Sequence, residues 1–199
     1  MRAAFFRMPG SVELCDVPDL QPGAGQVLVR MLASGICGSD DYAYRTGKEL
    51  GGLVRDEWHR RGHEYAGRVV AAGPGVEGLR VGDLVAGIGS LPCGSCAACR
   101  RDDPALCAGS RWCGAEGFSE YVCKGAEWFH LVPGLSAEQG ALIEPLTVAM
   151  EMVSDGGVTA GSTVLIMGAG PIGLMAIGVC RRIGARRVYV YHPSHSRAR

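Results

Sequence analysis

The sequence predicts a mixed β and α/β fold, in which an all-β unit is followed by the start of a parallel sheet. From Met1 to about residue 135, short apolar runs alternate with clusters rich in Gly and Pro, a pattern typical of short strands and tight turns. After Ser136 the pattern becomes a helical period, a strand, a glycine-rich turn, a helix and a second strand. The last four make a βαβ unit, the first piece of a parallel sheet. The 31 glycines among 199 residues, about twice the usual share, fit many tight turns.

The individual elements follow from the apolar runs and the turn residues between them. Strands of the first unit are expected at residues 27–32, 64–71, 84–88 and 118–122. Ser136 with Glu138 and Gln139 indicates a helix start, and helical periodicity continues from residue 137 to about 153. A strand at 163–167, a helix at 171–183 and a strand at 187–191 follow. We therefore expect one domain at residues 1–153 and a second at 154–199.

Composition excludes some function classes. The 20 basic and 20 acidic side chains cancel, whereas proteins that bind nucleic acid or anionic membranes normally carry a basic excess. The N-terminus does not read as a signal peptide, and no apolar run reaches the roughly 18 residues of a membrane span. We therefore expect a cytoplasmic protein with neither a nucleic-acid nor a membrane partner. In a reducing compartment, clustered cysteines are metal ligands or redox groups rather than disulfides.

Four of the 9 cysteines follow the spacing C-x2-C-x2-C-x7-C. Two-residue gaps let thiolates fold back around one ion, and four cysteines close a tetrahedral zinc shell, which makes such a site structural. An iron–sulfur cluster uses similar spacings and stays open as an alternative. A nucleic-acid-binding zinc ribbon is a weaker one, because adjacent acidic and basic pairs in this segment offset each other. The predicted ligands are Cys93, Cys96, Cys99 and Cys107.

A second group of metal-binding residues points to a family. Cys37 lies in GICGSD, and His63 opens the pattern G-H-E-x2-G-x5-G-x2-V. With the four-cysteine segment, an EPL segment and the glycine turn in the same order, the whole chain resembles the zinc-containing medium-chain alcohol/polyol dehydrogenases, in their sorbitol/threonine dehydrogenase-like branch. The resemblance implies a GroES-like β-barrel catalytic domain with a structural-zinc lobe at about residues 90–110. It also implies that the chain is the N-terminal portion of a longer enzyme.

The resemblance assigns a catalytic zinc site. Cys37 and His63 stand at ligand positions, and Glu144 stands where the polyol and threonine dehydrogenase branch supplies a carboxylate ligand. Glu64 is either a close neighbour of the metal or an alternative ligand. Three protein ligands leave a fourth position for water or a substrate oxygen. A buried carboxylate such as Glu144 needs a partner such as a metal ion.

The resemblance also suggests residues that face the substrate. Ser39 matches the family's hydroxyl that hydrogen-bonds the substrate alcohol and relays its proton. Tyr42 stands where family members often carry a histidine, which leaves the relay beyond Ser39 open. Trp58, Trp112 and Phe118 are candidates for pocket walls, although packing in the core or at the surface is the commoner role of such side chains.

The glycine turn predicts a dinucleotide site. Its sequence G-x-G-x-x-G follows a strand and opens a helix, the context in which the glycines admit a pyrophosphate at the helix N-terminus. The acidic residue that reads the NAD ribose is expected at the end of the next strand, where His192 stands instead. His192 and Arg197 could accommodate a 2′-phosphate, so we favour NADP. The remaining predicted cofactor-binding residues are Gly168, Gly170, Pro171, Ile172 and Gly173.

Taken with the resemblance, these sites predict a zinc-dependent oxidoreductase. It would transfer hydride between a secondary alcohol (a polyol, sugar or amino-alcohol) and NAD(P), with zinc polarising the substrate oxygen. Two zincs are expected per chain. A carbonyl reductase running in the opposite direction is one alternative, and a non-catalytic zinc-stabilised fragment is another. The full-length enzyme is expected to be a homodimer or homotetramer. Because one βαβ unit is only the start of a Rossmann-type domain, the 199-residue chain alone could be inactive.

Overall fold

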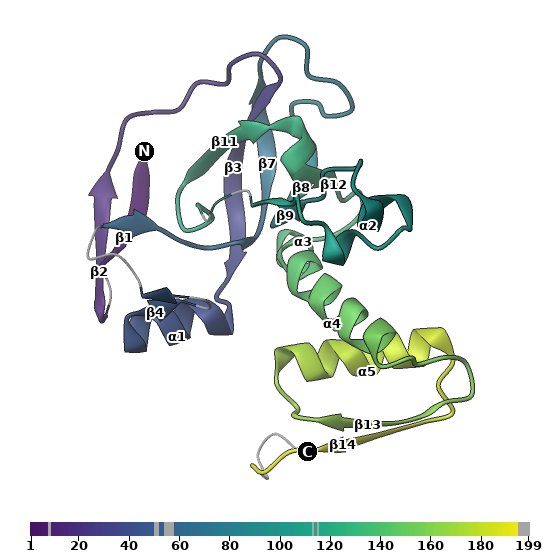
Figure 1. The fold of residues 1–199 in the computed structure, drawn as a ribbon. Helices are drawn as coiled ribbons and strands as arrows, with labels where there is room; N and C mark the ends of the chain where they lie inside the picture. The colour runs from purple at the N-terminus through teal and green to yellow at the C-terminus, as the bar shows by residue number, and fades with distance from the viewer. Residues whose placement is uncertain (8, 50–51, 54–57, 113, 115, 195–199) are drawn as a thin grey trace. The chain divides into compact units, whose positions relative to one another are not determined.

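The computed structural model describes residues 1–7, 9–49, 52–53, 58–112, 114 and 116–194. It is drawn as a ribbon in Figure 1. The chain forms two compact units, Met1–Glu144 and Pro145–Arg199, and each is described by itself. Within the described residues, no helix combines the length and apolar character that crossing a bilayer requires.

The first unit is built on a five-stranded antiparallel sheet in the order β11-β3-β7-β8-β12. Its core is a cluster of buried apolar side chains, most of them valines, that also contains Tyr65 and Phe129. Alternate residues of β3 face this core, as expected for a strand with one buried face. The strands are β3 (Gln26–Gly35), β7 (Glu64–Ala72), β8 (Leu84–Gly87), β11 (Tyr121–Gly125) and β12 (Phe129–Leu131).

The strands expected at residues 27–32, 64–71 and 84–88 are confirmed, but the one expected at 118–122 is displaced to β11. The backbone N–H of Gly117 donates to the carbonyl of Gly62 at 2.8 Å, and that of Phe118 donates to Arg61 at 3.0 Å. These bonds draw residues 117–118 to the segment before β7. The strand therefore begins only after this contact.

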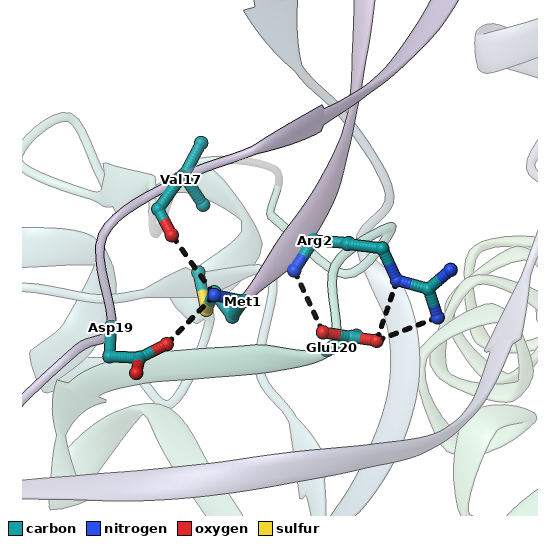
Figure 2. Close-up of polar contacts among 5 residues, drawn as sticks. All are labelled: Met1, Arg2, Val17, Asp19 and Glu120. Carbon is teal, nitrogen blue, oxygen red and sulfur yellow. Dashed lines mark hydrogen bonds and ion pairs between the residues drawn. The ribbon is translucent and has the colours of Figure 1, made fainter.

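A second sheet has the order β2-β1-β6, from β1 (Arg2–Arg7), β2 (Ser11–Asp16) and β6 (His59–Arg60). Figure 2 shows how its first strand is held. The Met1 ammonium donates to Asp19 at 2.7 Å and to the Val17 carbonyl at 3.0 Å. Arg2 donates to Glu120 through its backbone N–H at 2.7 Å and through its guanidinium at 2.8 and 3.0 Å. These contacts tie the start of the chain to residues far along it.

Short elements surround the two sheets. Helix α1 (Gly38–Thr46) follows β3. The segment that carries the four clustered cysteines lies between β9 (Ser90–Leu91) and β10 (Arg111–Trp112), which pair with each other. The remaining short elements are β4 (Lys48–Glu49), β5 (Gly52–Leu53), α2 (Ala97–Arg100), η1 (Pro104–Leu106) and η2 (Ala126–Trp128).

The helix expected from residue 137 to about 153 is two helices, α3 (Ala137–Ala141) and α4 (Ile143–Asp155). Ser136 opens α3 with a capping box, in which its side chain accepts from the Gln139 N–H, as predicted. The single-helix expectation is wrong because of Pro145. Proline has no N–H to bond the carbonyl four residues earlier and is tolerated only in a first turn, so a new helix begins just before it.

The second unit contains the predicted βαβ. Strands β13 (Thr163–Met167) and β14 (Arg187–Tyr191) pair in parallel, and α5 (Pro171–Ile183) connects them. All three have the predicted bounds. Ala149 and Val153 from α4 pack with Ala176 and Cys180 from α5 to form a small core. The order of a β unit followed by the start of a parallel sheet is therefore confirmed.

Candidate functional site

Two segments at the ends of neighbouring strands bring one group of candidate metal ligands together. Cys37 caps α1 just after β3, and His63 and Glu64 stand at the start of β7. Because β3 and β7 pair antiparallel with Gly35 opposite Glu64, the end of one strand meets the start of the other. The candidate ligand atoms of Cys37, His63 and Glu64 all lie within 4.8 Å of one another.

Two of the three donors of this group are buried, and Cys37 is partly buried. His63 and Glu64 are each 9% exposed. Desolvation raises the pKa of the Glu64 carboxyl, and the charge of Asp40 adds to it, while His63 and a hydrogen bond with the Cys37 thiol act the other way. A buried carboxylate is costly unless it has a cationic partner. The thiol, imidazole and carboxylate together are a donor set that suits zinc.

Glu144 lies next to this group. Desolvation raises the pKa of its carboxyl; the His63 charge lowers it, and the charges of Glu64 and Asp40 raise it further. A methyl group built on Gly89 would lie 3.4 Å from Glu144 Oε1. Glu144 therefore shares the electrostatic environment of His63. The compact three-residue group contains Glu64, the alternative ligand of the sequence analysis. Glu144, the carboxylate ligand that the resemblance implies, stays a prediction.

Trp112 forms an aromatic wall beside the group. Its ring centroid lies 5.8 Å from that of His63, with the planes inclined by 60°. The same methyl group built on Gly89 would lie 3.2 Å from the Trp112 ring. The next residue back on β10, Arg111, stacks its guanidinium 5.3 Å from the Trp128 ring centroid, which anchors the strand. The Trp112 indole therefore lies near both His63 and Glu144.

The other sequence candidates lie elsewhere. Ser39 is in the first turn of α1, two residues after Cys37, and is partly buried, whereas Tyr42 on the same helix is exposed. Phe118 packs on Phe6, with ring centroids 5.7 Å apart. Trp58 carries the Arg7 guanidinium 5.3 Å from its ring centroid. Packing is therefore the observed role of Phe118 and Trp58.

The four predicted cysteines also converge, with sulfur atoms within 4.8 Å of one another. Cys96 Sγ lies 3.5 Å from Cys99 Sγ, and the Cys93 N–H donates to Cys107 Sγ at 3.2 Å. Hydrogen bonds from Ser95 lower the pKa of Cys93 to about 6, while desolvation and the thiols of Cys96 and Cys107 raise the pKa of Cys99 to about 11. Four sulfur donors at one point, all free thiols, fit a closed metal shell.

The glycine turn has the geometry that a phosphate loop needs. Gly168 has φ +115°, a backbone conformation that favours glycine. A Cβ on Gly173 would overlap the Gly168 carbonyl oxygen, so only glycine allows this packing. Gly170 caps α5, and Pro171 and Ile172 open it, which leaves N–H groups at the helix start. His192 follows β14, and its Nδ1 accepts from the Ser194 N–H at 2.9 Å. Arg197 lies outside the described residues.

Sequence reasoning did not identify the ion pair of Arg61 with Asp40, which lies between the two ligand-bearing loops. The available signal was an arginine immediately before the G-H-E pattern. A charged side chain that lies just before a strand and is buried in the fold requires a partner of opposite charge.

Comparison with known proteins identifies the family. Residues 23–134 match the alcohol dehydrogenase GroES-like domain, and the chain belongs to this family. It is 39% identical over 202 residues to L-threonine 3-dehydrogenase of Pyrococcus horikoshii, covering 99% of the chain and 58% of that protein. It is 35% identical over 184 residues to sorbitol dehydrogenase of Bacillus subtilis, covering 90% and 51%. The resemblance to medium-chain alcohol/polyol dehydrogenases is confirmed.

Solved structures agree with this fold. A zinc-binding dehydrogenase from Sinorhizobium meliloti, bound to NADP, has a TM-score of 0.83 and 30% identity, covering 98% of the chain and 57% of that protein. An alcohol dehydrogenase from Escherichia coli, complexed with NADH, has a TM-score of 0.85 and 32% identity, covering 99% and 58%. The chain therefore spans a little over half the length of the proteins it matches.

Proposed function

We propose that this chain carries the metal site of a zinc-dependent oxidoreductase that transfers hydride between a secondary alcohol and NAD(P). The observation that carries the proposal is the convergence of Cys37, His63 and Glu64 within 4.8 Å at the β3–β7 junction. The membership of residues 23–134 in the alcohol dehydrogenase GroES-like family supports it.

Cys37, His63 and Glu64 would hold the ion, with Glu144 as the neighbouring candidate ligand. When bound, the ion supplies Lewis acidity toward an alcohol or carbonyl oxygen. The residues around it bind and orient the substrate. Ser39, in the first turn of α1, would accept a hydrogen bond from the substrate hydroxyl and relay its proton, releasing its own hydroxyl proton to solvent. The Trp112 indole would cover one side of the substrate.

The four-cysteine group is proposed as a structural zinc site. Four thiolates close a tetrahedral shell and leave no position for a substrate. The expected content is therefore two zincs per chain, one at each group.

The glycine turn and the start of α5 would bind the cofactor pyrophosphate. We favour NADP because His192, and no carboxylate, follows β14. Structural relatives bound to NADP and to NADH both exist, which supports the nicotinamide class rather than the choice within it.

The substrate class is a small hydroxylated molecule, such as a polyol, sugar or amino-alcohol. The named relatives, a threonine dehydrogenase and a sorbitol dehydrogenase, support this class. Oxidation of the alcohol is the proposed direction, and the carbonyl reduction stays the alternative. A reducing cytoplasm is proposed as the location, because all eight described cysteines are free thiols.

Metal analysis by mass spectrometry tests the proposal on the 199-residue chain. Wild type should hold two zincs, and Cys37→Ser and Cys96→Ser should each hold one. A single zinc in wild type that Cys37→Ser leaves unchanged would overturn the catalytic site. In a protein that contains this chain and the rest of a cofactor domain, reduction of NADP⁺ by secondary alcohols should disappear in Cys37→Ser and His63→Ala.

A further inference from the structure

One buried ion pair joins the two loops that carry the proposed ligands. Arg61 lies two residues before His63, and Asp40 lies three residues after Cys37. Arg61 Nε donates to Asp40 Oδ1 at 3.0 Å, and the two side chains are only 10% and 3% exposed. The interaction is therefore shielded from water, unlike an ordinary surface ion pair.

Asp40 uses its second oxygen to hold Cys37. The backbone N–H of Cys37 donates to Asp40 Oδ2 at 3.2 Å, and the Asp40 N–H donates back to the Cys37 carbonyl at 3.0 Å. The carboxylate thus binds the backbone of the residue whose sulfur is the proposed ligand. One carboxylate is shared between the Cys37 loop and Arg61.

Arg61 is held from the His63 side. Its carbonyl accepts from the Phe118 N–H at 3.0 Å. The next residue, Gly62, has φ +94°, and a Cβ there would lie 2.8 Å from the Phe118 nitrogen. These contacts fix the position of the backbone that leads into His63. The Arg61 side chain links this fixed backbone to Asp40.

We infer that Arg61 is a positioning residue for the metal site: through Asp40 it holds Cys37 at the separation from His63 and Glu64 that an ion requires. The inference rests on the proposed function, in which these three residues bind the metal. Outer partners that orient metal ligands commonly contribute 10- to 100-fold in metal affinity. Without the guanidinium, Asp40 would be a buried carboxylate without this partner, and the Cys37 loop would lose this one side-chain link to the His63 segment.

The test is the metal affinity of this site in Arg61→Met. This substitution keeps an unbranched side chain and removes the guanidinium. Cobalt is loaded into the site of a chain whose four-cysteine site holds zinc, and a chelator is titrated while the cobalt–thiolate absorption is recorded. We expect cobalt affinity to fall about 10- to 100-fold, with zinc retention at the four-cysteine site unchanged.

Arg60→Met is the matched control. Arg60 is the adjacent arginine and pairs with Glu116 at 2.6 Å, where both side chains are 27% exposed. This change removes an ion pair of the same kind that does not involve Asp40. Its cobalt affinity should equal that of wild type.

The outcomes separate the inference from the function on which it rests. If wild type binds no cobalt outside the four-cysteine site, the proposed function fails. If wild type binds it and Arg61→Met binds it equally well, only the inference fails, even where Arg61→Met unfolds more easily. If Arg61→Met does not fold, Arg61→Lys and Asp40→Asn decide: weaker cobalt binding in both supports the inference, and wild-type affinity in both overturns it.

Discussion

The Trp112 indole and the His63 imidazole lie with ring centroids 5.8 Å apart and planes inclined by 60°. An aromatic ring at this distance from a proposed metal ligand is both a wall of the site and a reporter of what binds there.

Loading cobalt into the Cys37–His63–Glu64 site should quench the fluorescence of Trp112. The ion absorbs in the near ultraviolet and visible, and this indole lies beside one of its ligands. Emission is recorded during a cobalt titration of the chain whose four-cysteine site holds zinc. Trp112→Phe should lose the quenched component, whereas Trp58→Phe should keep it; the opposite result would place the ion elsewhere.

Gly35→Ala should weaken metal binding at the same site. A Cβ at residue 35 would overlap the carboxylate of Glu64, which lies directly opposite on β7. The carboxylate would have to move away, and Glu64 Cβ, which would lie 3.1 Å from the new methyl group, would have to shift slightly. Cobalt affinity is the measurement. Gly38→Ala is the control, because a Cβ there meets nothing within 4 Å; equal affinities in the two variants would refute the role given to Glu64.

Cys96→Ser should destabilise the first unit while leaving the other metal site intact. Loss of a metal that closes a loop segment belongs to the few mechanisms that cost more than about 3 kcal/mol. Chemical unfolding of zinc-loaded protein measures the loss, and metal analysis should show one zinc remaining. Cys123→Ser removes a cysteine outside the cluster and should retain both zincs. Full metal content and stability in Cys96→Ser would contradict the structural-zinc proposal.

In the metal-free protein, stability should fall as the pH rises through the titration of Glu64 and Glu144. Desolvation raises the pKa of both carboxyls in the folded state. The folded chain therefore keeps protons that the unfolded chain has released, so their contribution is fully present below the ordinary glutamate pKa. It is lost as the pH rises through the raised values.

Urea unfolding in the presence of a chelator measures this dependence. Glu144→Gln should show a smaller fall over the same pH range than wild type. Glu151→Gln, an exposed change on the same helix, should follow wild type. A fall in Glu144→Gln as steep as in wild type would argue against the prediction.

His192→Asp should shift cofactor preference from NADPH toward NADH. A carboxylate after β14 would accept from the ribose hydroxyls of NADH and repel a 2′-phosphate. Fluorescence titration of a protein with a complete cofactor domain is the measurement, and a change of about tenfold in the ratio of affinities corresponds to about 1.4 kcal/mol. An unchanged ratio would remove His192 from the cofactor site.

Local patterns predicted some parts of this molecule completely. The bounds of β13, α5 and β14 follow from one apolar strand, one glycine turn and one apolar helix, all contiguous in the chain. The four-cysteine group could be predicted equally well, because its members lie within fifteen residues and their spacing is typical of a zinc site.

Contacts between distant segments could not be predicted in this way. The displaced start of β11 depends on hydrogen bonds to residues 61 and 62. The break before α4 depends on Pro145. The helical spacing of apolar residues continues through this position, so the spacing alone does not predict the break. The proximity of Trp112 to His63, and of Arg61 to Asp40, arises only after strands and loops pair, so spacing along the chain does not reveal it.

The pairing of β3 with β7 has a consequence for folding. The two strands carry two register shifts, between Leu28 and Val29 and between Met31 and Ala33, so the alignment of Gly35 with Glu64 depends on both irregularities being in place. A slip by one residue would turn Glu64 to the opposite face of the sheet and separate the donors. Only the native alignment can gain the free energy of metal binding. Metal binding would thus stabilise the native alignment of β3 and β7 relative to shifted alignments, before any substrate binds.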